Sequence, residues 1–224
     1  MTQETLECVE ITTGPDPKHA IIWMHGLGAD ANDFVPIVPE LPIQGAPSIR
    51  FVFPNAPIQP VTINNGMAMR SWYDISTADL VRREDENGIR QSEQAIKALV
   101  ARENIRGIPT ENIVLAGFSQ GCAMAIHTGL RLNEKLAGIV CLSGYLPLLD
   151  KVADESSSAN QSTRIFMAHG TMDPVVPIER AKESYKWLTN NGYQVTWQEY
   201  PMPHSVCMEE VTDIGAFLVE VLKA

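Results

Sequence analysis

Short apolar runs alternate along this chain with longer stretches in which apolar residues recur at helical spacing. Strands buried on both faces read as continuous apolar runs and amphipathic helices as apolar stripes, so this alternation predicts an α/β fold. The sheet should be twisted and mainly parallel, with helices on both faces. We expect strands at residues 7–11, 20–24, 50–53, 113–116, 138–142, 164–168 and 194–200. We expect helices at residues 91–104, 124–132, 178–190 and 208–223.

Two longer segments fit neither pattern. They span residues 54–88 and 145–163 and should form loops or small excursions from the sheet. Loops of this length inside a compact domain often act as lids or binding segments. No shift in composition divides the chain, and 224 residues is near the upper length of one compact domain, so we expect a single domain over residues 1–224.

The charge of the chain argues against nucleic-acid partners. Its 17 lysines and arginines against 27 aspartates and glutamates give a formal net charge of −10. A nucleic-acid binder needs basic residues to displace counterions, whereas the largest basic cluster, residues 81–83, is followed at once by acidic residues. The same balance disfavours an anionic membrane surface.

Membrane insertion and export are not expected either. The longest apolar runs, such as residues 20–24, are far shorter than the ~20 residues that cross a bilayer. Residues 1–10 carry three acidic residues and no basic segment, unlike a secretory or organelle-targeting leader. A cytoplasmic location is the default expectation.

The chain shows no motif for a cofactor. It contains no HExxH sequence, no cluster of histidines and cysteines spaced as metal ligands, and no phosphate-binding loop. We therefore expect no metal and no nucleotide. The cysteines form no CxxC pair and should be free thiols: Cys8, Cys122, Cys141 and Cys207.

The strand at residues 113–116 runs directly into a GxSxG sequence, Gly117-Phe118-Ser119-Gln120-Gly121, where a helical pattern starts. A strand, this turn and a helix present a nucleophilic serine at the carboxyl end of a sheet. Glycine is needed on both sides because side chains there would collide with neighbouring backbone. Ser119 is therefore the candidate nucleophile. The alternative is that Gly117 and Gly121 only allow tight packing of strand and helix.

A serine hydroxyl is a poor nucleophile near neutral pH and needs a histidine as base, which needs an acid to fix its tautomer. In folds with this turn, the acid and then the histidine follow the serine along the chain. His204 lies in the loop between the last strand and the last helix, from which it can reach back over the sheet. His169, at the end of a strand, is the weaker candidate. A solvated surface role is the alternative for His204.

Asp173 is the candidate acid. It follows the strand at residues 164–168 closely, and the prolines beside it stiffen a loop that must hold a carboxylate in a fixed direction. Asp150 and Asp154 are rivals because they follow the preceding strand, but their segment is looser. A helix-flanking aspartate in a turn is the alternative for Asp173.

Two backbone N–H groups are candidates for binding the oxyanion that forms during acyl transfer. One belongs to Gln120, the residue after the nucleophile, at the positive end of its helix. The other belongs to Leu27, because the glycines of residues 25–30 let the chain turn back towards Ser119. His25 should hold this loop and take no part in proton transfer.

Apolar residues on loops at the catalytic end of the sheet predict a pocket for an apolar acyl chain. They are Leu27, Met67, Met69, Trp72, Leu146, Leu148, Val175 and Val176. Trp72, Leu146 and Val176 are the expected substrate contacts. The alternative for each residue is a place in the core, where Met and Val are common.

Four blocks of the chain resemble one known family. They are residues 23–30 (WMHGLGAD), 70–74 (RSWYD), 117–121 (GFSQG) and 169–173 (HGTMD) with His204-Ser205. Together they resemble the small carboxylesterases and acyl-protein thioesterases of the α/β-hydrolase superfamily, over nearly the whole chain. The resemblance implies no large lid domain and a short loop around Trp72 over the acyl group. It also implies a catalytic triad of Ser119, Asp173 and His204 and oxyanion donors at Leu27 and Gln120.

The expected function is hydrolysis of a carboxylic ester or acyl thioester through an acyl-Ser119 intermediate. Two substrate classes stay open: small acyl esters, and acyl chains carried by lipids or proteins. The competing hypothesis is a non-catalytic binding protein with a hydrolase fold. Such proteins usually have a broken triad, whereas here each member has a candidate. Exposed apolar surface near the site leaves a homodimer and transient lipid contact open.

Overall fold

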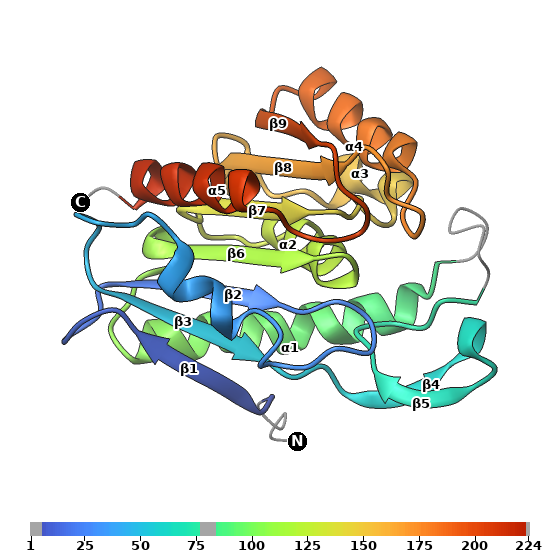
Figure 1. Ribbon diagram of the computed structural model, residues 1–224, viewed down its shortest axis with the longest axis horizontal. Coiled ribbons are helices and arrows are strands. Elements are labelled where there is room, and N and C mark those ends of the chain that lie inside the picture. The colour runs from blue at the N-terminus through green and yellow to red at the C-terminus, as the bar shows by residue number, and fades with distance from the viewer. Residues whose placement is uncertain (1–5, 77–83, 223–224) are drawn as a thin grey trace.

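The computed structural model describes residues 6–76 and 84–222, and within them a seven-stranded sheet forms the centre of the molecule (Figure 1). The strands lie in the order β1-β3-β2-β6-β7-β8-β9, and all neighbours are parallel except the edge pair β1 and β3. Their bounds are β1 Cys8–Thr12, β2 His19–Met24, β3 Ile49–Pro54, β6 Ile113–Phe118, β7 Gly138–Leu142, β8 Arg164–Gly170 and β9 Gln194–Tyr200. The mainly parallel sheet predicted from the sequence is confirmed.

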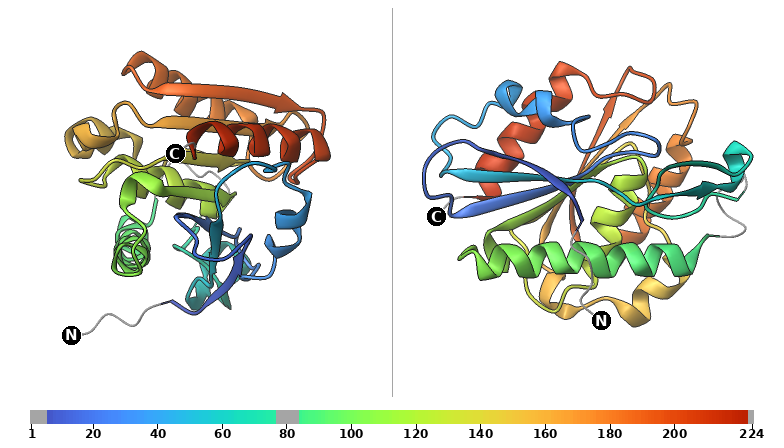
Figure 2. Two further views of the ribbon diagram at one scale, coloured as in Figure 1. Left: turned by 90° about the vertical axis from the view of Figure 1, so that its left-hand side faces the viewer. Right: turned by 90° about the horizontal axis from the view of Figure 1, so that it is seen from below.

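Helices cover both faces of this sheet (Figure 2). Their bounds are α1 Glu86–Ile105, α2 Gln120–Leu130, α3 Val152–Glu155, α4 Ile178–Asn190 and α5 Met208–Val221. In β2, Ile22 and Met24 pack in the layer of α1 and α2, whereas Ile21 and Trp23 pack in the layer of α5. Every residue of β2 is buried, which explains its continuous apolar run. No helix among the described residues is long and apolar enough to cross a membrane.

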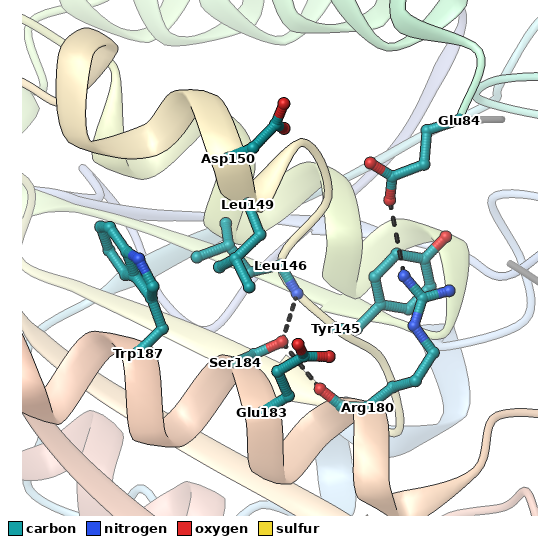
Figure 3. Close-up of a pocket in the computed structure, with 9 residues that line it drawn as sticks. All are labelled: Glu84, Tyr145, Leu146, Leu149, Asp150, Arg180, Glu183, Ser184 and Trp187. Carbon is teal, nitrogen blue, oxygen red and sulfur yellow. Dashed lines mark hydrogen bonds and ion pairs between the residues drawn. The ribbon is translucent and has the colours of Figure 1, made fainter. Parts of the chain in front are cut away.

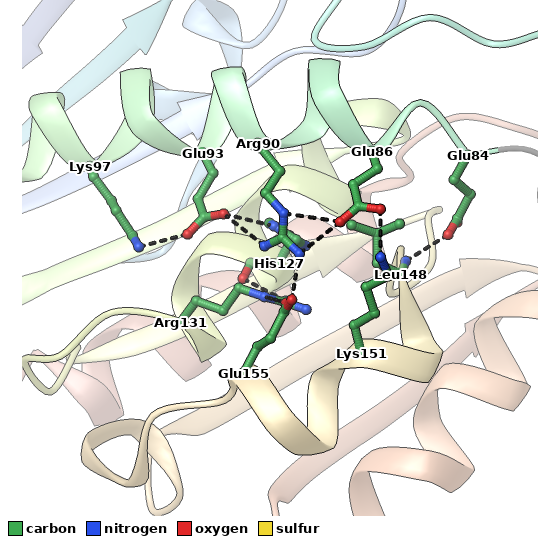
Figure 4. A network of polar contacts seen from close by, with 10 residues as sticks. All are labelled: Glu84, Glu86, Arg90, Glu93, Lys97, His127, Arg131, Leu148, Lys151 and Glu155. Atoms are coloured by element: carbon green, nitrogen blue, oxygen red, sulfur yellow. Dashed lines mark hydrogen bonds and ion pairs between the residues drawn. The ribbon is translucent and has the colours of Figure 1, made fainter.

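A buried hydrogen bond joins α1 to α2, the helix that follows the GxSxG turn. Nε2 of His127 on α2 lies 3.0 Å from Oε2 of Glu93 on α1, and Lys97 pairs with the other Glu93 oxygen at 2.6 Å (Figure 4). Burial alone would raise the pKa of Glu93, but the hydrogen bonds from His127 and Lys97 lower it to about 2. The ionised carboxylate therefore anchors α2 against α1.

The segment at residues 54–88, expected to be a loop, contains a β-hairpin. Strands β4 (Ile58–Val61) and β5 (Met67–Arg70) pair antiparallel beside the carboxyl ends of the parallel strands (Figure 1). A 3-10 turn, Thr62–Asn64, forms its tip. The sequence gives little sign of this hairpin because each strand has four residues and Pro60 interrupts the first.

Helix ends depend on polar residues that an apolar pattern does not reveal. Helix α1 begins at Glu86 rather than at the predicted residue 91, because the Asp85 side chain caps it by accepting the Gly88 N–H at 3.0 Å. The predicted end of the last helix, residue 223, lies outside the described residues. The second irregular segment, residues 145–163, contains α3 and short 3-10 turns, as expected for a small excursion.

Candidate active site

Ser119 occupies a strained turn between β6 and α2. Its φ of 56° and ψ of −117° are values that non-glycine residues rarely adopt, and its N–H donates to the Leu142 carbonyl at 2.8 Å. A Cβ atom on Gly117 would overlap the Gly121 backbone, and one on Gly121 would overlap the Met24 carbonyl. The two glycines therefore permit the close approach on which the turn depends, as the sequence predicts.

Asp173 and His204 are in hydrogen-bond contact. Nδ1 of His204 lies 2.6 Å from Oδ2 of Asp173, whose other oxygen accepts the N–H groups of Val175 and Val176 at 2.8 and 2.9 Å. The Asp173 side chain is fully buried, so these contacts fix its direction. Because a carboxylate only accepts hydrogen bonds, Nδ1 carries the proton and Nε2 of His204 is the basic nitrogen.

The loops that carry Asp173 and His204 are joined by backbone hydrogen bonds. Two N–H groups of residues 171–172 donate to carbonyls of residues 200–202 at 2.8 and 3.1 Å. The His204 ring packs against Phe118, the residue before the candidate nucleophile, with the ring centroids 4.6 Å apart. The imidazole and the GxSxG turn thus lie together at the carboxyl end of the sheet.

His169, the weaker candidate for the base, has a structural place. It is fully buried, with Nε2 2.8 Å from the Val176 carbonyl and 3.4 Å from Oδ2 of Asp173. Burial lowers the pKa of His169, which favours the uncharged ring. His169 therefore supports the Asp173 loop, a role that sequence reasoning missed although the two residues are close along the chain.

Two backbone N–H groups near Ser119 find no acceptor among the residues that the structure describes. The N–H groups of Leu27 and Gln120 donate to none of the described residues, and both residues line one cavity with Ser119. The Leu27 loop is held by His25, whose Nδ1 contacts the next carbonyl at 2.7 Å and whose Nε2 accepts the Ala56 N–H at 3.1 Å. Burial lowers the pKa of His25. With both nitrogens engaged, His25 holds the loop, as predicted.

The Gln120 side chain makes contacts that the sequence does not predict. Its Oε1 accepts the Trp72 N–H at 2.8 Å, and its Nε2 donates to the Tyr73 carbonyl at 2.6 Å. Trp72 itself is 1% exposed, and its indole N–H donates to the His25 carbonyl at 2.9 Å. Trp72 therefore lies beneath the Leu27 loop. This corrects its prediction as a substrate contact.

A largely apolar cavity of about 260 Å³ opens at Ser119. Among the residues that line it are Leu27, Ile63, Tyr73, Ile75, Tyr145 and Val176. Leu27 and Val176 are predicted pocket residues, and Val175 also lines the cavity. Ile63 comes from the hairpin tip, and neither tyrosine was predicted to line the pocket. Met67, Met69 and Leu148, predicted for the same pocket, do not line it.

The prediction that Leu146 contacts substrate is also corrected. It lines another cavity, which among the described residues shares only Tyr145 with the cavity at Ser119. Asp150, a rival to Asp173, also lines this second cavity. Neither Asp150 nor Asp154 makes a hydrogen bond or ion pair with His204. Among the three candidate acids, only Asp173 contacts the histidine.

The four cysteines are free thiols, as the sequence predicts. Cys122, which follows the GxSxG turn, and Cys141 of β7 are both buried, and burial raises the pKa of Cys141. Among the described residues, no group of three His, Cys, Asp or Glu side chains is placed to hold a metal ion.

Comparison with known proteins gives one consistent family. Residues 6–222 match the model of the phospholipase/carboxylesterase family. The chain is 40% identical to acyl-protein thioesterase 1 of Mycosarcoma maydis, over 95% of each chain, and 41% identical to that of Neurospora crassa, over 90% of this chain and 86% of the relative. SOBER1 of Arabidopsis thaliana has a TM-score of 0.86 and 28% identity over 92% of this chain and 99% of its own. The chain is a serine hydrolase and belongs to the phospholipase/carboxylesterase family of the α/β-hydrolase fold.

Proposed function

We propose that this enzyme hydrolyses carboxylic esters and acyl thioesters through an acyl-Ser119 intermediate. The observation that carries the proposal is the 2.6 Å contact between His204 and Asp173, beside the strained turn at Ser119. A buried carboxylate, an imidazole with one basic nitrogen and a serine on such a turn are the parts of a nucleophilic triad. Asp173 keeps the His204 ring in the tautomer that accepts a proton at Nε2.

The reaction follows from these roles. Nε2 of His204 takes the hydroxyl proton of Ser119 while Oγ bonds to the carbonyl carbon of the substrate. The tetrahedral oxyanion accepts the N–H groups of Leu27 and Gln120. His204 then gives its proton to the leaving alcohol or thiol, and the acyl-serine ester forms. Water deprotonated by His204 attacks this ester, releasing the carboxylic acid and restoring the Ser119 hydroxyl.

The backbone N–H groups of Leu27 and Gln120 stabilise the oxyanion without prior rearrangement. Neither the Leu27 nor the Gln120 N–H donates to another described residue, so no bond must break before charge develops. The Gln120 N–H also lies in the first turn of α2, where the helix dipole favours negative charge. Loss of one such donor typically costs ~2.7–4 kcal/mol of transition-state stabilisation.

Acylated proteins are the substrate class that we favour. The apolar walls of the Ser119 cavity suit a hydrocarbon chain, because they remove it from water. Relatives named acyl-protein thioesterase, at 40 and 41% identity, support a thioester-linked acyl chain on a protein. The phospholipase/carboxylesterase family match supports acyl esters of lipids as the second candidate class.

Labelling with a fluorophosphonate, followed by mass spectrometry of the modified peptide, tests the assignment. We expect modification at Ser119 and hydrolysis of both p-nitrophenyl esters and acyl thioesters. Ser119→Ala should lose labelling and turnover, whereas Ser158→Ala, which changes an exposed serine, should retain both. Labelling at another serine, or turnover by Ser119→Ala, would refute the proposal.

A further inference from the structure

Phe118, the last residue of β6, contacts both the His204 ring and the loop of Leu27. Its ring centroid lies 4.6 Å from that of His204. A Cβ atom on Gly26 would lie 3.4 Å from Cδ1 of Phe118, so the ring also borders the loop that carries the Leu27 N–H. Phe118 is not among the described residues that line the cavity at Ser119. Its effect on the reaction is therefore exerted through its neighbours rather than on the substrate.

Other aromatic rings support Phe118 on the side of the core. The Phe34 ring lies 5.6 Å from it, measured between centroids. Phe34 in turn stacks on Trp23 of β2, with the centroids 5.3 Å apart and the planes inclined by 24°. Trp23 is 1% exposed and belongs to the apolar layer that packs against α5. A chain of ring contacts thus leads from the core to His204 and fixes the position of Phe118.

The contact with Phe118 restrains the His204 ring in a direction that Asp173 leaves free. The hydrogen bond between Nδ1 and Asp173 fixes one point of the imidazole, but the ring can still rotate about that bond. Phe118 packs against the ring with the two planes inclined by 45°. A centroid separation of 4.6 Å is near the short limit for aromatic pairs, which indicates contact with a ring face rather than between two edges. Asp173 and Phe118 together fix the orientation of the imidazole.

The same contact favours a positive charge on His204. An aromatic ring attracts a cation within about 6 Å of its centroid, and exclusion of water strengthens this attraction. The His204 side chain is only 16% exposed, so little water competes with the ring of Phe118. In the proposed reaction, His204 becomes an imidazolium when it takes the proton of Ser119. An aromatic ring at this place therefore favours the state that forms during the reaction over the neutral imidazole.

Arg180 has the same two kinds of partner around a permanent cation (Figure 3). The carbon of its guanidinium lies 3.8 Å from the centroid of the Tyr145 ring, and one of its nitrogens lies 3.6 Å from a carboxylate oxygen of Glu84. A carboxylate and an aromatic ring thus compensate the charge of Arg180. The imidazole of His204 also has one carboxylate and one aromatic ring beside it.

We propose that Phe118 is a positioning residue for His204, an inference that rests on the proposed function. Its ring holds the imidazole in one orientation and stabilises the imidazolium while Oγ of Ser119 attacks the substrate. Among the described residues, the titratable groups that interact with His204 are Asp173, 2.6 Å away, and His169, whose pKa is lowered by burial. A substitution at position 118 leaves both groups in place, so a shift in the pH profile reports the aromatic ring.

Phe118→Leu removes the aromatic face and keeps an apolar side chain. It should lower kcat for a p-nitrophenyl ester by about two- to fivefold, with KM unchanged. The acidic limb of kcat/KM against pH should move to lower pH by about 0.4–0.7 unit, because the imidazolium loses a stabilising contact. Phe118→Tyr keeps the aromatic face and should restore both values. A ring that served folding alone would change the thermal midpoint without moving this limb.

Pentafluorophenylalanine in place of Phe118 separates the shape of the ring from its charge distribution. Fluorination keeps the ring but reverses the sign of its quadrupole, so its face repels a cation. The acidic limb should then move at least as far as in Phe118→Leu. The control Phe217→Leu removes a ring from the pair with Phe166, whose centroids are 5.7 Å apart in the same apolar layer, and should leave the acidic limb in place.

An acidic limb that stays at its wild-type pH in the pentafluorophenylalanine protein would overturn the proposal, as would an equal shift in Phe217→Leu. This comparison holds even where Phe118→Leu fails to fold, because the fluorinated residue preserves the ring. Failure of the proposed function has a different result. The wild-type enzyme itself would then show no turnover, or no fluorophosphonate label at Ser119.

Discussion

The Asp173 carboxylate divides its oxygens between His204 and its own loop. Oδ2 lies 2.6 Å from Nδ1 of His204, and Oδ1 accepts the N–H groups of Val175 and Val176 at 2.8 and 2.9 Å. The Asp173 side chain therefore orients the His204 ring and also stabilises the loop in which Asp173 itself lies. A substitution that keeps one oxygen separates these two roles.

Asp173→Asn is that substitution. Its amide oxygen can still accept the loop N–H groups, but its NH₂ group faces Nδ1 of His204 and favours the tautomer with the proton on Nε2, which cannot accept the serine proton. We expect kcat for a p-nitrophenyl ester to fall by about 10⁴-fold. The thermal midpoint should change little. Asp154→Asn, at an exposed rival acid, should retain wild-type kcat. Wild-type turnover in Asp173→Asn would contradict the role of Asp173.

Gln120→Ala tests the contacts between α2 and the segment after β5. It keeps the backbone N–H but leaves the buried Trp72 N–H without the acceptor that lies 2.8 Å away in the wild type. We expect the free energy of unfolding to fall by about 1–3 kcal/mol in urea denaturation, with fluorophosphonate labelling of Ser119 retained. The control Gln161→Ala removes a glutamine whose hydrogen bond is exposed, and it should lower the free energy of unfolding by less than Gln120→Ala does. Equal costs would show that the buried contact adds no stability.

The sheet and the contact between Asp173 and His204 could be predicted because they follow from local signals. Buried strands such as β2 need apolar residues on both faces, so their runs stand out. The GxSxG turn at Ser119 is a local signal because any residue with a Cβ atom in place of Gly117 or Gly121 would overlap neighbouring backbone. Chain order then selects His204 over His169, and Asp173 is the one candidate acid that contacts His204.

The pocket could not be predicted in the same way, because side-chain direction within loops depends on distant partners. Trp72 is apolar and lies near the site, but its indole N–H bonds the His25 carbonyl at 2.9 Å and buries the ring. Leu146 follows Tyr145 directly, yet of the two only Tyr145 lines the cavity at Ser119. Arg180 fixes the Tyr145 ring from another helix. The pattern of neighbouring residues in the sequence does not indicate such contacts between distant residues.

Tyr145→Ala should move the preferred acyl chain towards greater length. Tyr145 lines both cavities, so removing its ring joins the space of about 260 Å³ at Ser119 to the neighbouring space of about 470 Å³. The measurement is kcat/KM for p-nitrophenyl esters of increasing chain length. Tyr145→Phe keeps the ring and should keep the wild-type length profile. An unchanged profile in a folded Tyr145→Ala protein would show that another residue closes the acyl cavity.

Glu210 places a buried carboxyl group in the first turn of α5, the helix that follows the His204 loop. Burial raises its pKa from 4.5 to about 8, the Cys207 N–H opposes this, and the charge of Asp213 adds to it. The folded state therefore holds a proton that the unfolded state releases between about pH 4.5 and 8. The stability present below this window is lost as the pH rises through it, by at most about 1.4 kcal/mol per pH unit.

Glu210→Gln should remove this pH dependence, because the amide stays neutral across the whole range. Its free energy of unfolding should exceed that of the wild type by a margin that is small near about pH 5 and grows until about pH 8, above which the two curves run parallel. Urea denaturation across this range measures the margin. Glu209→Gln, at an exposed neighbour in the same turn, should show no such growth. Parallel curves for Glu210→Gln and wild type throughout would mean that Glu210 ionises alike in both states, contrary to its burial.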